Sequence, residues 1–212
     1  MTSPSLSVEL ALLERFETVI GVDEVGRGAL AGPVAVGAAA FSRQTETAFP
    51  SGLKDSKLLS EVKREAIAPL VQSWLPHNVG YSSVELIEAA GITKALEKAA
   101  VAAITPLISG STVVLLDGSH NWLALSGLEV EYVVRVKADR DCAVVSAAAL
   151  VAKVQRDQLM RELHELEPYF GFAGNKGYSS EQHIAALREY GPSNHHRKSW
   201  LAKILSDENA LF

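Results

Sequence analysis

The sequence has one cysteine, few aromatic residues and no long apolar run. The single cysteine, Cys142, excludes an internal disulfide and a zinc site built from cysteines. No apolar stretch approaches the roughly 18 residues that a membrane-spanning helix requires, so we expect no membrane partner. The first residues lack the basic and apolar segments of a secretory signal, and with the cysteine content this favours a cytoplasmic protein.

Basic residues are also in deficit, since 20 Lys and Arg face 25 Asp and Glu and the net charge is −5. This balance argues against a protein that coats nucleic acid through bulk charge. The charge is uneven, because residues 132–203 contain 11 Lys and Arg against 8 Asp and Glu, whereas residues 1–131 contain 9 against 15. The C-terminal third is therefore the expected contact for a polyanion; the alternative is an ordinary scatter of solvated surface charge.

The chain has 212 residues, of which 48% are hydrophobic, and this is enough for the core of one domain. We expect an N-terminal segment at 1–17, a single domain at 18–205 and a C-terminal tail at 206–212. The domain becomes helical from about residue 165. A monomer is expected.

Alternating strands and helices predict an α/β fold with a central sheet flanked by helices. Apolar and β-branched runs predict strands at 18–25, 33–41, 77–83, 112–116 and 130–136. Capping residues and helical spacing of apolar residues predict helices at 60–74, 91–108, 143–165 and 180–190.

Acidic residues lie at or just after three of the predicted strands: Asp23 and Glu24, then Asp117, then Asp139. Ligand sites in α/β sheets gather at strand ends, so these acids could converge. Their mutual repulsion would be relieved by Mg²⁺ or Mn²⁺, and two such ions activate a water and stabilise the leaving oxygen of a phosphodiester. Each acid alone has another interpretation, as a turn former or a surface residue. Only the set indicates a metal site.

Residues 23–28 read Asp-Glu-Val-Gly-Arg-Gly and combine acids with a glycine-flanked cation. Adjacent strand residues point to opposite faces, so Asp23 and Glu24 can share one ion only if the strand ends or bulges there. Gly26 and Gly28 favour such a distortion, and Asp23 is the expected central ligand. The Gly-Arg-Gly turn brings backbone N–H groups and the cation of Arg27 close to a polar ligand. This pattern predicts a metal-dependent site for a phosphate-bearing substrate.

These residues belong to an ordered series of motifs that closely resembles bacterial ribonuclease HII, a type 2 ribonuclease H. The resemblance extends from about Val19 to Trp200. Any one motif is weak, but the ordered series is specific. Its motifs are Gly21 to Gly28 with Ala31-Gly32-Pro33, Asp55 to Ser60, Leu116-Asp117-Gly118, Val136 to Asp139, Ala152-Lys153-Val154 with Arg156-Asp157, Lys176-Gly177-Tyr178 with His183, and His195-His196-Arg197.

The resemblance implies a ribonuclease H-like fold, with a central mixed sheet flanked by helices and a helical C-terminal extension. It implies Mg²⁺- or Mn²⁺-dependent hydrolysis of RNA in RNA–DNA hybrids. It also implies cleavage on the 5′ side of ribonucleotides embedded in duplex DNA, which leaves 3′-hydroxyl and 5′-phosphate ends. Such cleavage initiates the removal of misincorporated ribonucleotides.

The resemblance also implies residue roles. The metal-binding catalytic acids are Asp23, Glu24, Asp117 and Asp139, and the ribose 2′-hydroxyl is recognised by Gly26, Arg27 and Gly28. Tyr178 stacks on the sugar of the following deoxynucleotide; its motif alone would indicate an ordinary turn aromatic. Close backbone approach suits a 2′-hydroxyl reader, and tyrosine offers a flat apolar face.

Several polar and basic residues of these motifs are candidates for phosphate or substrate contact, with surface solvation as the alternative: Ser56, Lys57, Lys153, Lys176 and Arg197. His195 and His196 are adjacent, which disfavours joint metal chelation and favours phosphate contact or helix capping. The tail Asn209–Phe212 loosely resembles segments that dock on sliding clamps; the alternative is a frayed terminus.

Two other functions compete with the ribonuclease. A catalytically silent nucleic-acid-binding domain is disfavoured, because a pure binder gains nothing from four acids facing phosphates. Another metal-dependent nuclease on the same fold is disfavoured by Gly26-Arg27-Gly28 and Tyr178, since such an enzyme needs no 2′-hydroxyl reader.

Overall fold

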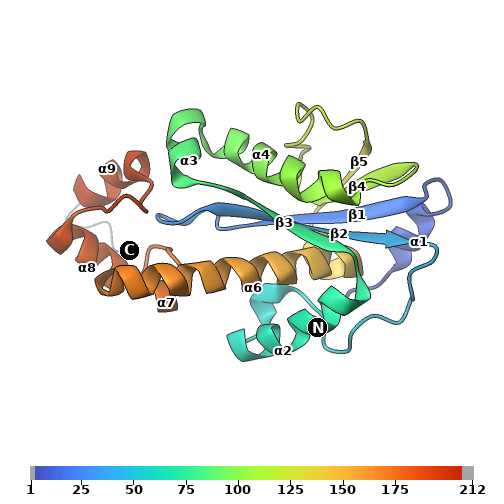
Figure 1. The fold of residues 1–212 in the computed structure, drawn as a ribbon, viewed down its shortest axis with the longest axis horizontal. Coiled ribbons are helices and arrows are strands. Elements are labelled where there is room, and N and C mark those ends of the chain that lie inside the picture. Colours follow the sequence, from blue (N-terminus) through green and yellow to red (C-terminus); the bar gives the residue numbers. More distant parts are fainter. Residues whose placement is uncertain (1–2, 207–212) are drawn as a thin grey trace.

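The computed structural model describes residues 3–206, which contain a five-stranded mixed sheet (Figure 1). The strand order is β3-β2-β1-β4-β5. Strand β1 pairs antiparallel with β2 and parallel with β4, so β2 runs in the opposite direction to both β1 and β4. The strands are β1 (Thr18–Val25), β2 (Val34–Ser42), β3 (His77–Ser82), β4 (Thr112–Asp117) and β5 (Glu131–Arg135). The expected mixed sheet flanked by helices is confirmed.

Helices cover both faces of the sheet, and the chain after the longest helix is helical to the end of the described residues (Figure 1). The α-helices are α1 (Ser7–Leu12), α2 (Glu61–Trp74), α3 (Val84–Ala90), α4 (Ile92–Ile104), α5 (Ala138–Asp141), α6 (Ala143–Leu166), α7 (Phe172–Asn175), α8 (Glu181–Tyr190) and α9 (Lys198–Ser206). Short 3₁₀ helices are η1 (Ser56–Leu58), η2 (Thr105–Leu107) and η3 (Pro168–Phe170).

Five of these helices, α1, α3, α5, α7 and α9, were not predicted individually from the sequence, and one predicted helix is interrupted. The helix expected at 91–108 ends at Ile104, and the chain tightens into η2, which contains Pro106. Proline has no N–H to donate, so it suits the start of a new short helix better than the interior of a long one. None of the described helices combines the length and apolarity that crossing a bilayer requires.

Glycines in the strands let α6 and α4 approach the sheet closely. A Cβ on Gly21 would lie 2.7 Å from the backbone of Val144, and one on Gly37 would lie 2.2 Å from the carbonyl oxygen of Ala148. Helix α6 therefore lies directly on β1 and β2. On the opposite face, a Cβ on Gly80 would lie 2.0 Å from the carbonyl oxygen of Ala99 in α4.

Two apolar cores result, one on each face of the sheet. Val19 of β1 packs in the core beneath α6, whereas Ile20 and Val22 pack in the core beneath α4. This alternation is the two-residue period of a regular strand. A third, smaller core joins α6 to the C-terminal helices and contains Met160, Phe170 and Phe172.

The N-terminal residues pack on the domain and fix the start of α6. Glu9 in α1 is fully buried, and its Oε1 accepts the Val144 N–H at 2.9 Å. This bond satisfies one of the free donors at the α6 N-terminus. Burial raises the pKa of Glu9, partly offset by this hydrogen bond. No sequence pattern indicates this contact, because it joins residues 135 positions apart.

The strand register brings two of the acidic residues to the same end of the sheet. Pairing between β1 and β4 ends at Val22 opposite Leu116, so Asp23 and Asp117 are the next residues on two adjacent parallel strands. Pairing between β1 and β2 continues unbroken to Val25 opposite Ala35. The connection from 26 to 33 then extends beyond the sheet toward the C-terminal helices (Figure 1).

Candidate active site

Asp23 is the centre of an acidic cluster. Its side chain is buried, and its pKa is raised well above the usual range, first by burial and then by the charges of Glu24, Asp117 and Asp139. The pKa of Asp117 is likewise raised, first by burial and then by the charge of Asp139. The described chain therefore brings the predicted acids close enough to act on one another, although they come from three separate segments.

Asp117 and Asp139 are joined through the backbone that follows β5. Asp117 Oδ1 accepts the N–H of Ala138 at 2.6 Å and that of Asp139 at 3.4 Å. Lys137 precedes them in a left-handed conformation with φ of 62°, and this residue turns the chain from β5 into α5. Asp139 therefore lies in a short helix rather than at the end of a strand. The carboxylate of Asp117 is held in place by N–H donors at the start of that helix.

The expected distortion of β1 at Asp23 and Glu24 is absent from the structure. Both residues pair regularly with β2, opposite Gly37 and Val36, so their side chains leave opposite faces of the sheet. Asp23 lies on the α6 face. Glu24 lies on the α4 face, and its Oε1 is 3.3 Å from Nη1 of Arg27. Gly26 makes its bend after the strand, since its φ of 81° comes one residue beyond Val25.

A lysine lies against the acidic cluster. Lys57 in η1 places its Nζ 2.8 Å from Asp139 Oδ2, and 71% of its side chain is exposed. Partial burial lowers the pKa of Lys57, but the bond to Asp139 and the surrounding carboxylates outweigh it and hold the pKa above its usual range. Its ammonium therefore supplies part of the positive charge that the cluster needs.

The donor chemistry of the cluster fits a hard divalent cation. Within residues 3–206, no three His, Cys, Asp or Glu side chains lie together as a ready-made metal cage. Magnesium does not need one, because it keeps several waters and binds through one or two carboxylates plus phosphate oxygens of a substrate. Asp23 carries a buried carboxylate surrounded by like charge. A divalent ion would relieve this repulsion directly.

The turn of residues 26–28 follows the acids at the tip of β1. Gly26 needs its positive φ, and a Cβ there would lie 2.1 Å from Nε of Arg156, so no other residue fits. Gly28 differs, since nothing lies within 4 Å of a Cβ placed on it and its φ is not in the left-handed region. Arg27 and Gly28 are both exposed. The space over Gly28 is therefore open to a ligand.

Tyr178 lies beside this turn. Leu30 and Ala31 donate their N–H groups to the carbonyl oxygen of Gly177, at 2.7 and 3.2 Å. The guanidinium carbon of Arg156 lies 5.7 Å from the centre of the Tyr178 ring, which is 37% exposed. The structure thus brings together the turn and the tyrosine, which are separated by about 150 residues in the sequence.

Two of the cations expected to contact phosphate are internal. Arg197 is fully buried and donates to the carbonyl oxygens of Gly26, Arg27 and Gly32. Lys176 is buried as well, and its Nζ lies 2.9 Å from Oε1 of Glu61. Both expectations are corrected, because neither side chain is accessible to a phosphate. Composition could not distinguish them from surface cations.

The other expected contacts differ in accessibility. Lys153 Nζ lies 2.7 Å from Oδ1 of Asp157, and burial lowers its pKa despite this bond. Ser56 is buried in η1, and its carbonyl oxygen accepts from Arg64 at 3.0 Å. Lys57, by contrast, is mostly exposed. It is the lysine of this set that remains free to reach a phosphate.

His196 forms a buried pair with His183, so the expected phosphate contact or helix cap is wrong. The two Nε2 atoms lie 3.0 Å apart, and Phe170 packs edge-on against both rings. His183 also bonds through Nδ1 to the carbonyl oxygen of Tyr178 at 2.8 Å. Through the His183 bond, this pair holds the backbone carbonyl group of Tyr178 in place. No local pattern in the sequence indicates the His183–His196 pair, because the two residues lie 13 positions apart.

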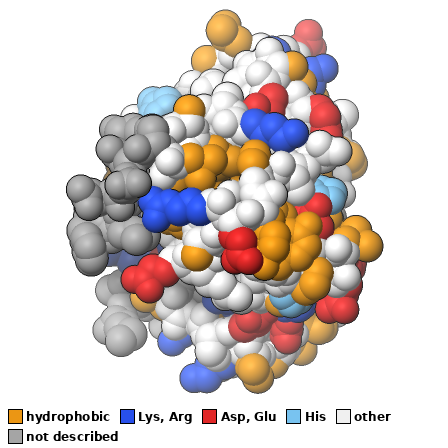
Figure 2. Space-filling model, turned by 90° about the vertical axis from the view of Figure 1, so that its left-hand side faces the viewer, with side chains coloured by type: hydrophobic (Ala, Val, Ile, Leu, Met, Phe, Trp, Pro, Cys, Tyr) orange, Lys and Arg blue, Asp and Glu red, His pale blue; other side chains and the backbone are white. Residues whose placement is uncertain are grey.

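The end of the molecule that carries α8 and α9 has mixed charge. Figure 2 shows acidic and basic side chains interspersed around a central group of apolar ones. The surplus of Lys and Arg in the C-terminal third therefore does not form one continuous basic surface on this face. The burial of Arg156, Arg197 and Lys176 explains part of the difference.

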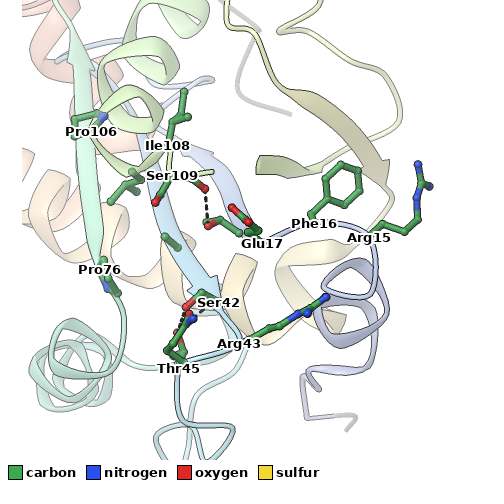
Figure 3. Close-up of a pocket in the computed structure, with 14 residues that line it drawn as sticks. Arg15, Phe16, Glu17, Ser42, Arg43, Thr45, Pro76, Pro106, Ile108 and Ser109 are labelled. Carbon is green, nitrogen blue, oxygen red and sulfur yellow. Dashed lines mark hydrogen bonds between the residues drawn. The ribbon is translucent and has the colours of Figure 1, made fainter. Parts of the chain in front are cut away.

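A large pocket lies at the other end of the sheet. It has a volume of about 790 Å³ and is lined by residues that include Arg15, Glu17, Arg43 and Ser109 (Figure 3). It begins where β1 begins, whereas the acids lie where β1 ends. None of the predicted site residues lines it.

Comparisons with known proteins agree with these observations. A model of the family described as Ribonuclease HII matches residues 20–203. Ribonuclease HII of Streptomyces avermitilis is 45% identical over 185 residues, which cover 87% of this chain and 77% of that protein.

Two solved structures share the fold. The structure of a PCNA:RNase HII complex from Archaeoglobus fulgidus superposes with a TM-score of 0.71 and 24% identity, covering 91% of this chain and 98% of that one. A structure of Bst-RNase HIII in complex with Mn²⁺ superposes with a TM-score of 0.63 and 19% identity, covering 84% and 65%. At these identities the likeness concerns the fold.

Proposed function

The chain belongs to the ribonuclease HII family, and we propose that it hydrolyses RNA in RNA–DNA hybrids and cuts 5′ to ribonucleotides embedded in duplex DNA. The products are a 3′-hydroxyl and a 5′-phosphate, and the cut initiates removal of a misincorporated ribonucleotide. The observation that supports this most is the acidic cluster around Asp23 beside the turn of residues 26–28 and Tyr178. Metal-binding groups and groups suited to sugar recognition lie next to each other.

Mg²⁺ or Mn²⁺ is the proposed cofactor, held by Asp23, Glu24, Asp117 and Asp139. A bound ion supplies a nucleophilic water and stabilises charge on the leaving oxygen. Mn²⁺ is present in the Bst-RNase HIII structure with the same fold. Glu24 leaves the opposite face of β1 from Asp23, but its charge acts on both Asp23 and Asp117, so we propose that it reaches the ions around the end of the strand and assign Asp23 and Asp117 the larger share of the binding.

The remaining residues orient the substrate. The open space above Gly28 admits a ribose, and the exposed N–H groups of the turn are donors for its 2′-hydroxyl. Tyr178 offers a flat, partly exposed ring to the next sugar. Lys57 lies on the acidic cluster with a flexible, exposed stem, and its ammonium can turn to a phosphate when a metal ion neutralises Asp139.

End-labelled cleavage tests the proposal. A duplex with one embedded ribonucleotide and the matching all-DNA duplex are incubated with Mg²⁺ and with Mn²⁺. We expect the first to be cut on the 5′ side of the ribonucleotide and the second to stay intact. Binding without cutting indicates a silent binding domain, and equal cutting of both duplexes indicates another nuclease. Either result overturns the proposal.

Contact with a sliding clamp is a separate proposal. The A. fulgidus neighbour was solved as a complex with PCNA. The matching feature here is the tail Asn209–Phe212, which lies outside the described residues. Deleting residues 207–212 should weaken binding to a sliding clamp in a pull-down with purified proteins, and unchanged affinity removes the idea.

A further inference from the structure

Two buried arginines, Arg156 and Arg197, lie under the turn that we propose to read the sugar. Arg156 comes from α6 and Arg197 immediately precedes α9. Both side chains are fully buried. Their hydrogen bonds go to backbone carbonyl oxygens rather than to carboxylates. Burying guanidinium groups in this way is costly, so their position calls for an explanation beyond packing.

Arg197 binds the backbone of the turn from the interior of the domain. Its Nη2 donates to the carbonyl oxygen of Gly26 at 2.7 Å and to that of Gly32 at 3.0 Å, and its Nη1 donates to that of Arg27 at 2.8 Å. The planar fork of a guanidinium suits three such acceptors at once. Burial and then the charge of Arg156 lower the pKa of Arg197 to about 10.

The orientation of these carbonyl groups determines the orientation of the N–H groups that follow them. The C=O and the N–H of one trans peptide point in opposite directions, and the described chain contains no cis peptide. Because the carbonyl groups of Gly26 and Arg27 point inward to Arg197, the N–H groups of Arg27 and Gly28 point outward. Both residues are exposed, and neither N–H donates to a backbone carbonyl of the described residues.

Arg156 links the segment that follows this turn to the segment that carries Tyr178. It donates to the carbonyl oxygens of Pro33 at 2.9 Å and Ala31 at 3.2 Å on one side, and of Lys176 at 3.0 Å on the other. Its guanidinium also lies under the Tyr178 ring, 5.7 Å from the ring centre. One side chain thus sets the spacing between the turn and the tyrosine.

We propose that Arg197 and Arg156 are positioning residues for ribonucleotide recognition: Arg197 aims the Arg27 and Gly28 N–H groups at the 2′-hydroxyl, and Arg156 holds Tyr178 at a set distance from them. This inference rests on the proposed function and adds to it. The residues do not touch the metal cluster. Their substitution should therefore affect selection of the sugar and leave metal binding unchanged.

Competition binding without divalent metal tests the role of Arg197, because no cleavage then occurs. The preference for a duplex with one ribonucleotide over the all-DNA duplex is measured for wild type, Arg197→Lys and Arg197→Met. A lysine presents one ammonium and cannot hold three carbonyl groups in a plane. We expect the preference to fall about tenfold in both variants, as for the loss of a pair of hydrogen bonds, while Mn²⁺ affinity by titration calorimetry stays within twofold.

Arg161→Lys is the matched control. Arg161 also lies on α6, but it is partly exposed and its Nη2 bonds to Glu65 at 2.8 Å, away from the turn. Its variant should keep the wild-type preference. If the wild type shows no preference, the proposed function fails. If the wild type shows one and Arg197→Lys retains it, the positioning role fails and the function stands.

Hydrogen exchange of the wild-type protein gives a result even where a variant does not fold. The amides of Arg27 and Gly28 should exchange rapidly in the free protein. The ribonucleotide duplex should slow their exchange at least about tenfold, and the all-DNA duplex should not. Equal protection by both duplexes, or by neither, overturns the assigned direction of these N–H groups.

Discussion

The Nε2 atoms of His183 and His196 lie 3.0 Å apart in a buried pair, and this contact determines the tautomer of both rings. His183 Nδ1 faces the carbonyl oxygen of Tyr178 and must donate, so its Nε2 accepts. His196 therefore donates through Nε2 and accepts the Ser193 N–H at Nδ1, which lies at 3.1 Å. Both rings are neutral, and an added proton on either ring would face a donor.

This pair predicts loss of stability in mild acid. The pKa of His196 is lowered to about 4, first by burial and then by the neighbouring basic groups His183, His195 and Lys198. The folded pKa is thus below the value of about 6.5 in the unfolded chain. Stability is full above pH 6.5 and declines as the pH falls toward 4, because the unfolded chain takes up the proton first. Between pH 7 and pH 5 the loss from this group should be about 2 kcal/mol.

Urea unfolding at the two pH values measures this loss. His196→Gln should reduce it, and His120→Gln, at an exposed histidine, should leave it as in wild type. An identical pH dependence in wild type and His196→Gln would contradict the role of the pair.

Neutralising Asp23 should raise the free energy of unfolding and lower the rate of cleavage. The buried carboxylate is surrounded by negative charge, and Asp23→Asn removes that repulsion, so the free energy of unfolding should rise by about 1–2 kcal/mol. Cleavage of the single-ribonucleotide duplex should fall at least about 100-fold, and the same loss is expected of Asp117→Asn. Asp141→Asn is the control, because this acid lies on α5 but pairs with Arg140. Wild-type cleavage by Asp117→Asn would refute the metal-site assignment.

The two glycines of the turn should respond differently to alanine. Gly28→Ala meets no atom within 4 Å, so stability should change by less than about 0.5 kcal/mol while kcat/KM falls at least about tenfold, because the methyl group occupies the space proposed for the ribose. Gly26→Ala strains a φ of 81° and meets Arg156, and should cost about 2 kcal/mol or more. Thermal unfolding and steady-state kinetics separate the two effects. Full activity of Gly28→Ala would exclude close approach at this residue.

Lys57 should compete with the metal ion. Its ammonium bonds to Asp139, so Lys57→Met should tighten Mn²⁺ binding about two- to fivefold, the equivalent of an exposed ion pair of about 0.4–1 kcal/mol. Titration calorimetry gives the dissociation constants. Lys54→Met removes the same charge from the same loop and should have a smaller effect. If the two variants bind Mn²⁺ equally, net charge rather than the bond to Asp139 accounts for the change.

The sequence predicted the strands well because most of them consist of short local runs of apolar and β-branched residues. It did not predict α1, α3, α5, α7 and α9 individually, and these have between four and nine residues. Helices this short have little intrinsic stability, and contacts with the rest of the fold stabilise them. The predicted bulge at Asp23 and Glu24 was also wrong. Gly26 does bend the chain, but the bend occurs one residue after the strand.

The amino-acid sequence alone predicted the acids, the Gly-Arg-Gly turn and Tyr178 as site residues, because the ordered series of motifs in which they stand is specific although each single motif is weak. Only the tertiary structure decided which cations are accessible. Arg197 and Lys176 look like surface charges in the sequence, yet the fold buries both against backbone carbonyl oxygens or an acid. Burial depends on what packs from distant segments, and this is why the sequence identified the residues that form the cluster but not those that hold the turn in place.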